Sequence, residues 1–498
     1  MKINVVIGGI QEQSAQAIVV NLFEGVTEPG GATGAVDAAL GGQIQALIAG
    51  GDFRGKAGEV AVLYPGAAIP AERVIIVGLG KSDDFDAEGA RRASAAAAKK
   101  ARSLGVTELH TIAHGAGIGG LAPEDAAAAA VEGAILGLYR FHELKTKLDD
   151  VRPDIETLTL VEFDAERQAA LERGARRGQI LAESTNFTRD LVNRPANIAT
   201  PEHLAEQARQ IADAGDMTIQ VLDHEGIAAL EMHAFLSVAQ GGGAPPRLII
   251  LEHNADRDDL PTVALVGKGI TFDTGGISIK PSQDMGRMKG DMAGGAAVLG
   301  AMRAISQLDL PLRVVGLVPA TENMPDANAT KPGDVVNSRK GLTIEIINTD
   351  AEGRMLLVDA LTYTEEFGPD AIFDMATLTG SHVIALGTVA AAAMGDDDLI
   401  EKLRAAGETT RERVWPLPLF KEYDEQLKSE VADTKHLGGR PAGAITAGYF
   451  LSKFTPEDVP WVHIDMAGME ITDKGEHYTP TGATGYGVRL FVEMLRNW

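Results

Sequence analysis

Acidic and basic side chains gather in two stretches of the chain, each of which follows a strand-like segment. The first stretch is GKGITFDTGGISIKP, Gly267 to Pro281, and it continues as far as Asp291; the second is NTDAEGR, Asn348 to Arg354. Between them they supply the carboxylates and amines Asp273, Asp291, Asp350, Glu352, Lys268 and Lys280. Carboxylates suit hard divalent cations, and four of them can neutralise two dications. The pattern therefore predicts oxygen-rich metal chemistry.

The second stretch spaces its charges two residues apart. In an extended segment such residues face the same side, so Asp350, Glu352 and Arg354 are expected to converge on one point. Taken alone, the run that begins at Asp273 is more typical of a turn, and Lys268 of a solvated strand end. The chain has no HExxH motif, so the metal interpretation depends on the carboxylates.

The surrounding pattern predicts an α/β fold in two domains, because 498 residues exceed the usual size of one hydrophobic core. Strand-like segments at Lys2–Ile7, Val60–Tyr64 and Val74–Gly78 precede an alanine-rich helix near Ala87–Leu104. A charged segment that includes Asp149 and Asp150 then leads to a strand at Leu158–Glu162. The boundary is expected just after this strand.

Residues 1–163 are thus predicted to form a smaller N-terminal α/β domain, with a role in assembly or access, and residues 164–498 a larger catalytic domain. Residues 164–187 have the charge-and-alanine pattern of a connecting helix. Beyond them, nearly continuous apolar strands alternate with helices near Glu202–Ala214 and Gly294–Ser306; the strands are Arg247–Glu252, Val263–Gly267, Arg313–Val318 and Thr343–Ile347. Such strands are typical of a largely parallel central sheet covered by helices, with function in the loops at strand ends.

Composition narrows the possible partners. The net charge of −25 disfavours non-specific attraction to nucleic acid or to an anionic membrane. The chain has no cysteine, which excludes disulfides, thiolate metal sites and cysteine nucleophiles. The amino end reads as a strand rather than a secretory signal, so a cytoplasmic location is expected. Ala376–Gly395 approaches the length of a membrane span, but its hydroxyl side chains favour buried core and loop.

Two glycine clusters in the first part of the chain resemble phosphate-binding loops. They are Gly30-Gly31 with Gly34, and Gly78-Leu79-Gly80. Neither cluster matches GxxxxGK[ST] or GxGxxG, so both are predicted to be turns rather than nucleotide sites.

The two charged stretches resemble the leucyl aminopeptidase family, also called the cytosol aminopeptidases, which are two-metal exopeptidases. Similar segments cover the whole second domain: NRPAN from Asn193, ATENMP from Ala320, ATLTG from Ala376 and ATGYGVR from Ala483. The first domain resembles the family only in its size, its α/β character and the segment Tyr139-Arg140-Phe141 near its end. The resemblance implies peptide substrates with a free amino end and a homohexamer built as a dimer of trimers.

The resemblance also assigns the metal ligands. Asp273 and Glu352 would bridge two divalent cations, Lys268 and Asp291 would complete the tighter site, and Asp350 would complete the exchangeable one. The ions would be Mn²⁺ or Zn²⁺, with Mg²⁺ or Co²⁺ also possible. An ammonium group has no lone pair to donate, so Lys268 would have to be neutral.

Two further residues would be catalytic by the same resemblance. Lys280 would donate to the oxyanion of the tetrahedral intermediate, and Arg354 would hold a bicarbonate ion that carries the proton from water to the leaving amine. The alternatives are a loop charge for Lys280 and a structural ion pair for Arg354. The first side-chain pocket, which implies a preference for leucine and other apolar residues, would be lined by Met288, Thr377, Gly380 and Ala467. Met288 is equally compatible with core packing.

Some residues depart from the family pattern. Gly295 stands where alanine is usual, and His436 stands where asparagine is common; His382 follows the Ala376 segment. Both histidines are expected to be structural. Two other functions remain open: a DNA-binding architectural role, which some bacterial members of the family perform and which the net charge disfavours, and a two-metal phosphatase or nuclease activity.

Overall fold

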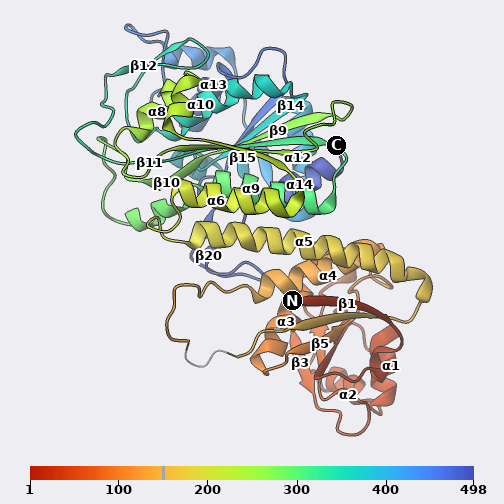
Figure 1. Ribbon diagram of the computed structural model, residues 1–498. Helices are drawn as coiled ribbons and strands as arrows, with labels where there is room; N and C mark the ends of the chain where they lie inside the picture. Colours follow the sequence, from red (N-terminus) through yellow and green to blue (C-terminus); the bar gives the residue numbers. More distant parts are fainter. Residues whose placement is uncertain (149–151) are drawn as a thin grey trace. The chain divides into compact units, whose positions relative to one another are not determined.

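The computed structural model describes residues 1–148 and 152–498 and divides into two compact units (Figure 1). Unit 1 comprises Met1–Asn186 and Lys474–Thr481, and unit 2 comprises Phe187–Asp473 and Gly482–Trp498. The helix α5 (Gln168–Asn193) covers most of the segment predicted to connect the domains. Asp149 and Asp150 lie outside the described residues. The predicted two-part α/β fold is confirmed.

Unit 1 contains a sheet with the strand order β1-β6-β5-β2-β4-β3. Only β3 runs antiparallel to its neighbour; the other pairings are parallel. The strands are β1 (Lys2–Ile7), β2 (Ala17–Leu22), β3 (Val60–Leu63), β4 (Val74–Gly78), β5 (Glu108–Thr111) and β6 (Thr157–Glu162). The strands predicted at Lys2–Ile7, Val60–Tyr64 and Val74–Gly78 therefore correspond to β1, β3 and β4, while β2 and β5 were not anticipated.

The helices of unit 1 are α1 (Gly31–Ala39), α2 (Gln43–Gly50), α3 (Ala87–Ser103) and α4 (Pro123–Leu138). Small residues let α3 and α4 approach closely: a β-carbon on Gly133 would lie 2.2 Å from the carbonyl oxygen of Arg91. The segment Lys474–Thr481 returns to this unit, where the hydroxyl of Tyr478 donates to Glu88 at 2.8 Å. Glu88 is buried and also pairs with Arg91 at 3.2 Å, so this segment completes a buried ionic network within unit 1.

Unit 2 is built on a sheet with the order β16-β15-β18-β14-β9-β11-β8-β7, in which β10 also pairs with β11. The central strands β18, β14, β9, β11 and β10 are mutually parallel, and antiparallel pairings occur toward both edges. The strands are β7 (Thr218–Leu222), β8 (Arg247–His253), β9 (Thr262–Gly267), β10 (Gly269–Asp273), β11 (Arg313–Asn323), β14 (Ala371–Ala376), β15 (Ala391–Gly395), β16 (Val414–Pro416) and β18 (Trp461–Asp465). This is the largely parallel sheet that the apolar strands predict. One predicted strand is an exception, because Thr343–Ile347 contains only the short β13 (Thr343–Glu345), which belongs to a separate three-stranded sheet.

Helices cover both faces of this sheet, with α6, α9 and α14 on one face and α8, α10 and α13 on the other (Figure 1). Their bounds are α6 (Pro201–Gly215), α7 (His224–Ala229), α8 (His233–Ala239), α9 (Ala293–Leu308), α10 (Gly353–Tyr363), α11 (Gly380–Leu386), α12 (Asp397–Thr410), α13 (Gly443–Ser452) and α14 (Val488–Arg496). Short strands complete the unit: β12 (Val335–Asn337), β13 (Thr343–Glu345), β17 (Thr434–Lys435), β19 (Ile471–Thr472) and β20 (Gly482–Ala483). Burial on both faces explains why the central strands are apolar throughout.

The uncharged stretch Ala376–Gly395 comprises the end of β14, the helix α11 and the strand β15. Most of β14 and β15 is buried, as expected for core rather than for a membrane span. Across the described residues, we find no helix that combines the length and the apolar character needed to cross a bilayer.

Candidate metal centre

The charged residues of the two stretches meet at the carboxyl edge of the parallel strands of unit 2. Lys268 directly follows β9, Asp273 ends β10, Asn323 ends β11, Thr377 directly follows β14 and Asp465 ends β18. Parallel strands present their carboxyl ends at the same edge, where α/β proteins usually bind ligands. The topology of the sheet therefore gathers these side chains.

Glycines allow helix α9 to reach this edge. A β-carbon on Gly267 would lie 2.5 Å from the carbonyl oxygen of Gly294, and one on Gly294 would lie 2.1 Å from that of Met375. The N–H of Gly295 donates to the carbonyl of Lys268 at 2.7 Å, and a β-carbon on Gly295 would lie 2.7 Å from Cγ1 of Val318. At position 295, glycine rather than the usual alanine leaves room for the side chain of Val318. The close approach of α9 to the sheet brings Asp291, which precedes this helix, beside Lys268.

Lys268 is the centre of a buried ion-pair network. Its Nζ lies 2.8 Å from Oδ1 of Asp291 and 2.7 Å from Oε1 of Glu352, and it donates to the carbonyl of Thr377 at 3.0 Å. Burial lowers the pKa of this amine, but the charges of Asp291 and Glu352 outweigh burial and raise the pKa above its usual value. Lys268 thus joins one carboxylate from each of the two predicted stretches.

Lys280 joins the other two carboxylates. Its Nζ lies 2.8 Å from Oδ2 of Asp273 and 2.6 Å from Oδ1 of Asp350. The other oxygen of Asp273 accepts from the N–H of Gly275 at 2.8 Å and from Nδ2 of Asn323 at 2.7 Å. Burial lowers the pKa of Lys280, yet the charge of Asp273 raises it more, so this amine is held in its charged form.

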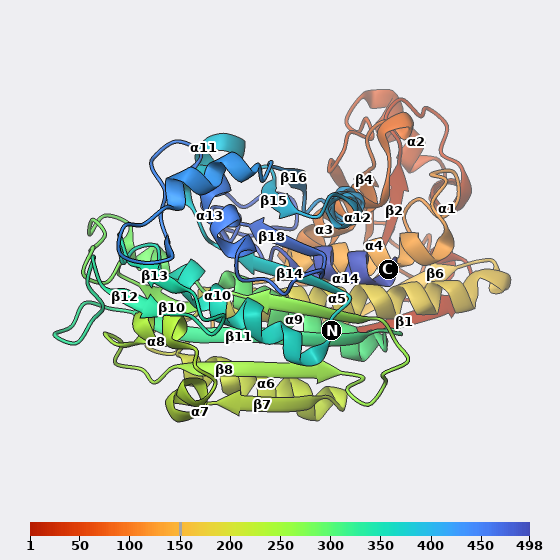
Figure 2. The same cartoon turned by 90° about the horizontal axis from the view of Figure 1, so that it is seen from above.

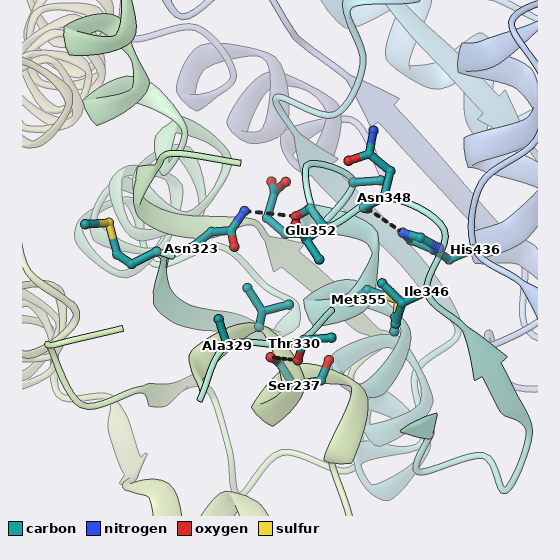
Figure 3. A pocket seen from close by; sticks show the side chains of 13 residues that line it. Ser237, Asn323, Ala329, Thr330, Ile346, Asn348, Glu352, Met355 and His436 are labelled. Atoms are coloured by element: carbon teal, nitrogen blue, oxygen red, sulfur yellow. Dashed lines mark hydrogen bonds between the residues drawn. The ribbon is translucent and has the colours of Figure 1, made fainter. Parts of the chain in front are cut away.

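The second stretch is not extended, and in this respect the expectation of a period of two is wrong. Asp350 lies in a turn, and Glu352 directly precedes α10 with helical backbone angles. The turn is held from both sides: Nδ2 of Asn323 donates to the carbonyl of Thr349 at 3.0 Å, and Nε2 of His436 donates to that of Asn348 at 2.9 Å (Figure 3). Asp350 and Glu352 therefore converge because a turn, held by Asn323 and His436, leads directly into helix α10.

These residues fit an oxygen-seeking divalent cation. One carboxylate oxygen from each of Asp273, Asp350 and Glu352 lies within 4.8 Å of the others. Oδ2 of Asp291 and Oε2 of Glu352 are buried and have no hydrogen-bond partner in the described part of the chain, although buried carboxylate oxygens normally have one. Burial first, and then repulsion by Glu352, raise the pKa of Asp273. Such a cluster gains most from added positive charge.

Arg354 is buried beside this cluster. Its Nη1 donates to the carbonyl of His436 at 2.8 Å, and its Nε is buried and unpartnered among the described residues. Burial lowers the pKa of this guanidinium to about 10, against the opposing charges of Glu352 and Asp465. The part of the chain that the structure describes shows no carboxylate in ion-pair contact with Arg354, and the Nε–H of its guanidinium is available to an anion.

Asp465 organises the residues predicted to line the side-chain pocket. Its Oδ1 accepts from the N–H groups of Leu378, Thr379 and Ala467 at 3.1, 3.3 and 3.3 Å, and its Oδ2 accepts from the hydroxyl of Thr379 at 2.6 Å. Ala467 is thereby brought to the loop that carries Thr377 and leads into Gly380 at the start of α11.

Met288 reaches this region from elsewhere in the chain. It lies on the 3-10 helix Met285–Gly290 and is partly buried. Its carbonyl accepts from the N–H of Asp291 at 3.3 Å, which ties its position to a predicted metal ligand. Thr377 is tied to the same residue, since its hydroxyl donates to Oδ1 of Asp291 at 2.7 Å.

His382 and His436 both form hydrogen bonds with main-chain groups, as expected for structural residues. His382 is fully buried, with its ring nitrogens 3.0 and 2.9 Å from the carbonyls of Ala467 and Ala390. In His436, Nδ1 accepts from the N–H of Ile347 at 3.1 Å while Nε2 donates to Asn348. This pattern requires a neutral ring, and burial, with the charge of Arg354, lowers the pKa of His436 to about 4.

Asn323 and Asp465 are functional residues that the sequence motifs do not indicate. Asn323 supports both Asp273 and the turn before Glu352, and Asp465 supports the predicted pocket. The signal that could have indicated them is their position, since each is a polar residue that ends a buried strand at the functional edge of the sheet.

Comparison with known proteins finds matches to family models in both parts of the chain. Residues 186–492 match the model of the cytosol aminopeptidase family, catalytic domain, and residues 19–148 match the model of its N-terminal domain. The chain belongs to the cytosol aminopeptidase family. It is accordingly a metallo-aminopeptidase, which hydrolyses peptides in a metal-dependent reaction.

Relatives in the cytosol aminopeptidase family match nearly the whole chain. A probable cytosol aminopeptidase of Syntrophotalea carbinolica is 45% identical over 92% of this chain and 93% of its own length. One of Roseiflexus castenholzii is 43% identical over 100% of this chain and 99% of its own.

Solved structures of similar fold include tomato leucine aminopeptidase, in a mutant form, and the bottromycin maturation enzyme BotP in complex with Mn. The tomato enzyme has a TM-score of 0.87 at 32% identity, covering 100% of this chain and 97% of its own. BotP has a TM-score of 0.85 at 34% identity, covering 97% of this chain and 99% of its own.

Proposed function

We propose that this metallo-aminopeptidase uses a pair of divalent cations to release leucine and other apolar residues from the amino ends of peptides. The observation that carries the proposal is the convergence of three buried carboxylates and one partly buried carboxylate, Asp350, on two lysines, with two carboxylate oxygens left unpartnered among the described residues. Four carboxylates balance two dications in charge and supply the ligand type that such ions prefer.

Within the site, Asp273 and Glu352 would bridge the cations, Lys268 and Asp291 would complete one site, and Asp350 would complete the other. When bound, a pair of divalent cations lowers the pKa of water toward neutrality and polarises a carbonyl. Lys268 would lose its proton to serve as a ligand, because the positive field of a cation reverses the effect that the carboxylates have on its pKa. Mn²⁺ or Zn²⁺ are the proposed ions, and a relative of known structure is described in complex with Mn.

Lys280 would remain charged and donate to the oxyanion that forms as the peptide carbonyl is attacked. Its raised pKa supports a protonated amine throughout the working pH range, and its 23% exposed side chain is far more accessible than that of Lys268. Arg354 would hold bicarbonate through its unpartnered Nε, and this ion supplies a base between the water and the leaving amine.

Specificity for the amino end would come from the same centre, since a free, neutral α-amine can coordinate a cation and an internal peptide bond cannot. Beside it, Met288, Thr377, Gly380 and Ala467 would line the pocket for the first side chain. The methionine and the small residues support an apolar pocket, because Met adapts its shape to aliphatic groups.

The assembly and location follow from the family. We propose a homohexamer arranged as a dimer of trimers, and a cytoplasmic location, which the description of the relatives as cytosol aminopeptidases supports. Light scattering at micromolar concentration is expected to report six subunits; a monomer would contradict this assembly.

The experiment that tests the activity compares three substrates with Mn²⁺ or Zn²⁺ supplied. Leucine p-nitroanilide is expected to be cleaved, while its N-acetylated form is not, because acetylation removes the amine that a cation would bind. p-Nitrophenyl phosphate distinguishes the phosphoesterase alternative. Hydrolysis of the phosphate without hydrolysis of leucine p-nitroanilide, or equal rates on the free and acetylated anilides, would overturn the proposal.

A further inference from the structure

Unit 1 contains a cavity of about 470 Å³ that the aminopeptidase reaction does not use. Its lining residues all lie between Gly8 and Arg167, so the cavity belongs to unit 1 and is separate from the metal centre. Sites for small molecules usually have volumes of about 300–1,000 Å³. The cavity is therefore large enough for a ligand rather than only for water.

The cavity lies where the course of the chain reverses in the sheet of unit 1. Strands β5 and β2 are parallel neighbours in the order β1-β6-β5-β2-β4-β3. From β2 the chain continues toward β3 and β4, whereas from β5 it continues to β6 on the other side; Figure 2 labels β2, β4 and β6. The loops after β2 and β5 both line the cavity. Open parallel sheets bind their ligands at such a switch point, at the carboxyl ends of the strands.

Most of the lining is apolar. Leu22, Phe23 and Val26 contribute from the region of β2, and Ile112 contributes from the loop after β5. Two further lining residues, Ile118 and Phe163, are 82% and 78% exposed, so they add accessible apolar surface to the cavity. The apolar walls fit the ring of an organic ligand, and a bound ring would cover these exposed groups.

One end of the cavity offers hydrogen-bond donors to an anion. Helix α1 starts at Gly31, has no side-chain cap and has no acidic residue in its first turn. Gly31, Ala32 and Thr33 line the cavity, and in the described residues no hydrogen bond from their N–H groups is found. The free N–H groups and the helix dipole favour a phosphate group at this position. Two lining residues, Glu162 and Arg167, carry opposite charges that lie 3.9 Å apart and compensate each other.

The loop after β5 has the glycine spacing of a nucleotide-binding loop. Gly115, Gly117 and Gly120 form GxGxxG between β5 and α4, a match that the other glycine clusters lack. A β-carbon on Gly115 would meet Phe85 at 2.5 Å, so packing requires that glycine, whereas one on Gly117 would meet nothing within 4 Å. Gly117 lines the cavity, and its lack of a side chain keeps this space open. GxGxxG indicates dinucleotide binding where it directly follows a strand and opens a helix. Here Gly115 comes after the end of β5 at Thr111 and Gly120 comes before the start of α4 at Pro123, so the motif supplies a glycine-rich loop at the cavity rather than that fingerprint.

We propose that this cavity is a second ligand site, which binds a nucleoside monophosphate or a closely similar phosphorylated ring compound. The phosphate lies at the amino end of α1, and the ring lies against the apolar wall formed by the loops after β2 and β5. The cavity at the switch point carries the proposal, and the free N–H groups of α1 and the glycine-rich loop after β5 place the two parts of the ligand within it.

The test measures binding by isothermal titration calorimetry with full-length, metal-loaded enzyme. Adenosine monophosphate is the probe, and adenosine and inorganic phosphate are titrated separately. Gly30→Asp places a carboxylate at the cap position of α1, where a β-carbon meets only Ile118 at 3.9 Å. Asp is a favoured cap residue, so folding is retained while the N–H groups are occupied and an anion is repelled. Gly30→Ala is the matched control, since it adds the β-carbon without the charge.

The expected result is saturable binding of adenosine monophosphate that weakens at least about tenfold in Gly30→Asp and stays within about twofold in Gly30→Ala. Adenosine and phosphate are each expected to bind more weakly than the monophosphate, and hydrolysis of leucine p-nitroanilide is expected to be unchanged in both variants. Equal binding of phosphate alone would reduce the site to an anion site and overturn the ring assignment. Binding that persists in Gly30→Asp would place the nucleotide elsewhere, and no binding at millimolar concentration would refute the site.

Discussion

A β-carbon added to Gly353 would lie 2.5 Å from Cε and 2.8 Å from Nζ of Lys268. The amine of Lys268 therefore occupies the space that a side chain at the start of α10 would fill. Because the stem of Lys268 is only 3% exposed, it has little room to move aside. The glycine of NTDAEGR is thus part of the predicted metal site, although it carries no ligand atom.

From this relationship, Gly353→Ala is expected to lower metal affinity and activity together, since the methyl group displaces the proposed ligand. Gly286→Ala is the control, because a β-carbon there meets nothing within 4 Å. Metal content after dialysis, measured by atomic emission, and kcat/KM for leucine p-nitroanilide test the prediction. Full metal content together with normal activity in Gly353→Ala would argue against Lys268 as a ligand.

The carboxylates of the second stretch give another prediction. Asp350→Asn and Glu352→Gln each remove a negative charge with almost no change in volume, so they are expected to abolish turnover while circular dichroism shows an intact fold. Glu345→Gln is a suitable comparison, because Glu345 lies on β13 and is only partly buried. Rates near those of the wild type in metal-replete buffer would exclude the proposed centre.

Lys280 is predicted to act on the reaction rather than on metal binding. Lys280→Ala is expected to retain its metal and to lose roughly 100-fold in kcat, about 3 kcal/mol, which is typical of the loss of one oxyanion donor. Metal analysis and steady-state kinetics on the same preparation separate the two effects. Loss of metal in parallel with activity would instead make Lys280 a structural counterion of Asp273 and Asp350.

Asp465 is predicted to position the loop that carries Thr377. Asp465→Ala leaves the N–H groups of Leu378, Thr379 and Ala467 without their acceptor, so KM for leucine p-nitroanilide is expected to rise about tenfold, more than kcat falls. Asp465→Asn keeps one acceptor oxygen, and its amide can donate to the hydroxyl of Thr379, so most of the loss should be recovered. A KM unchanged in Asp465→Ala would contradict a role in shaping the substrate pocket.

The buried side chain of His114 is expected to make the stability of unit 1 depend on pH. Its ring is fully buried, and burial lowers its pKa from 6.5 to about 4. The unfolded chain therefore binds more protons between these values, so stability is complete above pH 6.5 and falls as the pH decreases toward 4, by up to about 1.4 kcal/mol per unit.

His114→Gln keeps an acceptor for Nδ2 of Asn21, which now lies 3.0 Å from Nδ1 of the ring, but it cannot titrate. Hydrogen exchange of the amides in β2 and β5 is the measurement. The difference in protection between wild type and variant is expected to decrease steadily below pH 6.5; a difference independent of pH would mean that His114 has the same pKa in the folded and the unfolded chain.

The sequence predicted the fold well where its pattern was long and regular. Continuous apolar strands and long amphipathic helices match β8, β9 and β11 and α6 and α9 to within a few residues, except that β11 extends beyond Val318 to Asn323. Shorter elements such as β5 carry too few residues for a periodic pattern, and their place depends on neighbours far away in the sequence.

The carboxylates and lysines of the candidate site were also predicted, because their motifs are long. What could not be predicted is how they are held. Asn323 and Asp465 bind main-chain groups of distant segments, and those contacts exist only once the sheet has formed. The local geometry of Glu352 was missed for the opposite reason: a spacing of two suggests a strand, whereas the hydrogen bonds of Asn323 and His436 impose a turn followed by a helix.

The return of Lys474–Thr481 to unit 1 has a consequence for how this protein can be dissected. A fragment that ends at Asn186 lacks Tyr478 and leaves an oxygen of the buried Glu88 without its hydroxyl donor, so it should be less soluble and less stable than its length suggests. A protease that cuts once near residue 186 would not release unit 1 either, because Lys474–Thr481, which belongs to the second fragment, still packs non-covalently within unit 1. The cut chain should travel as a single species until it is denatured.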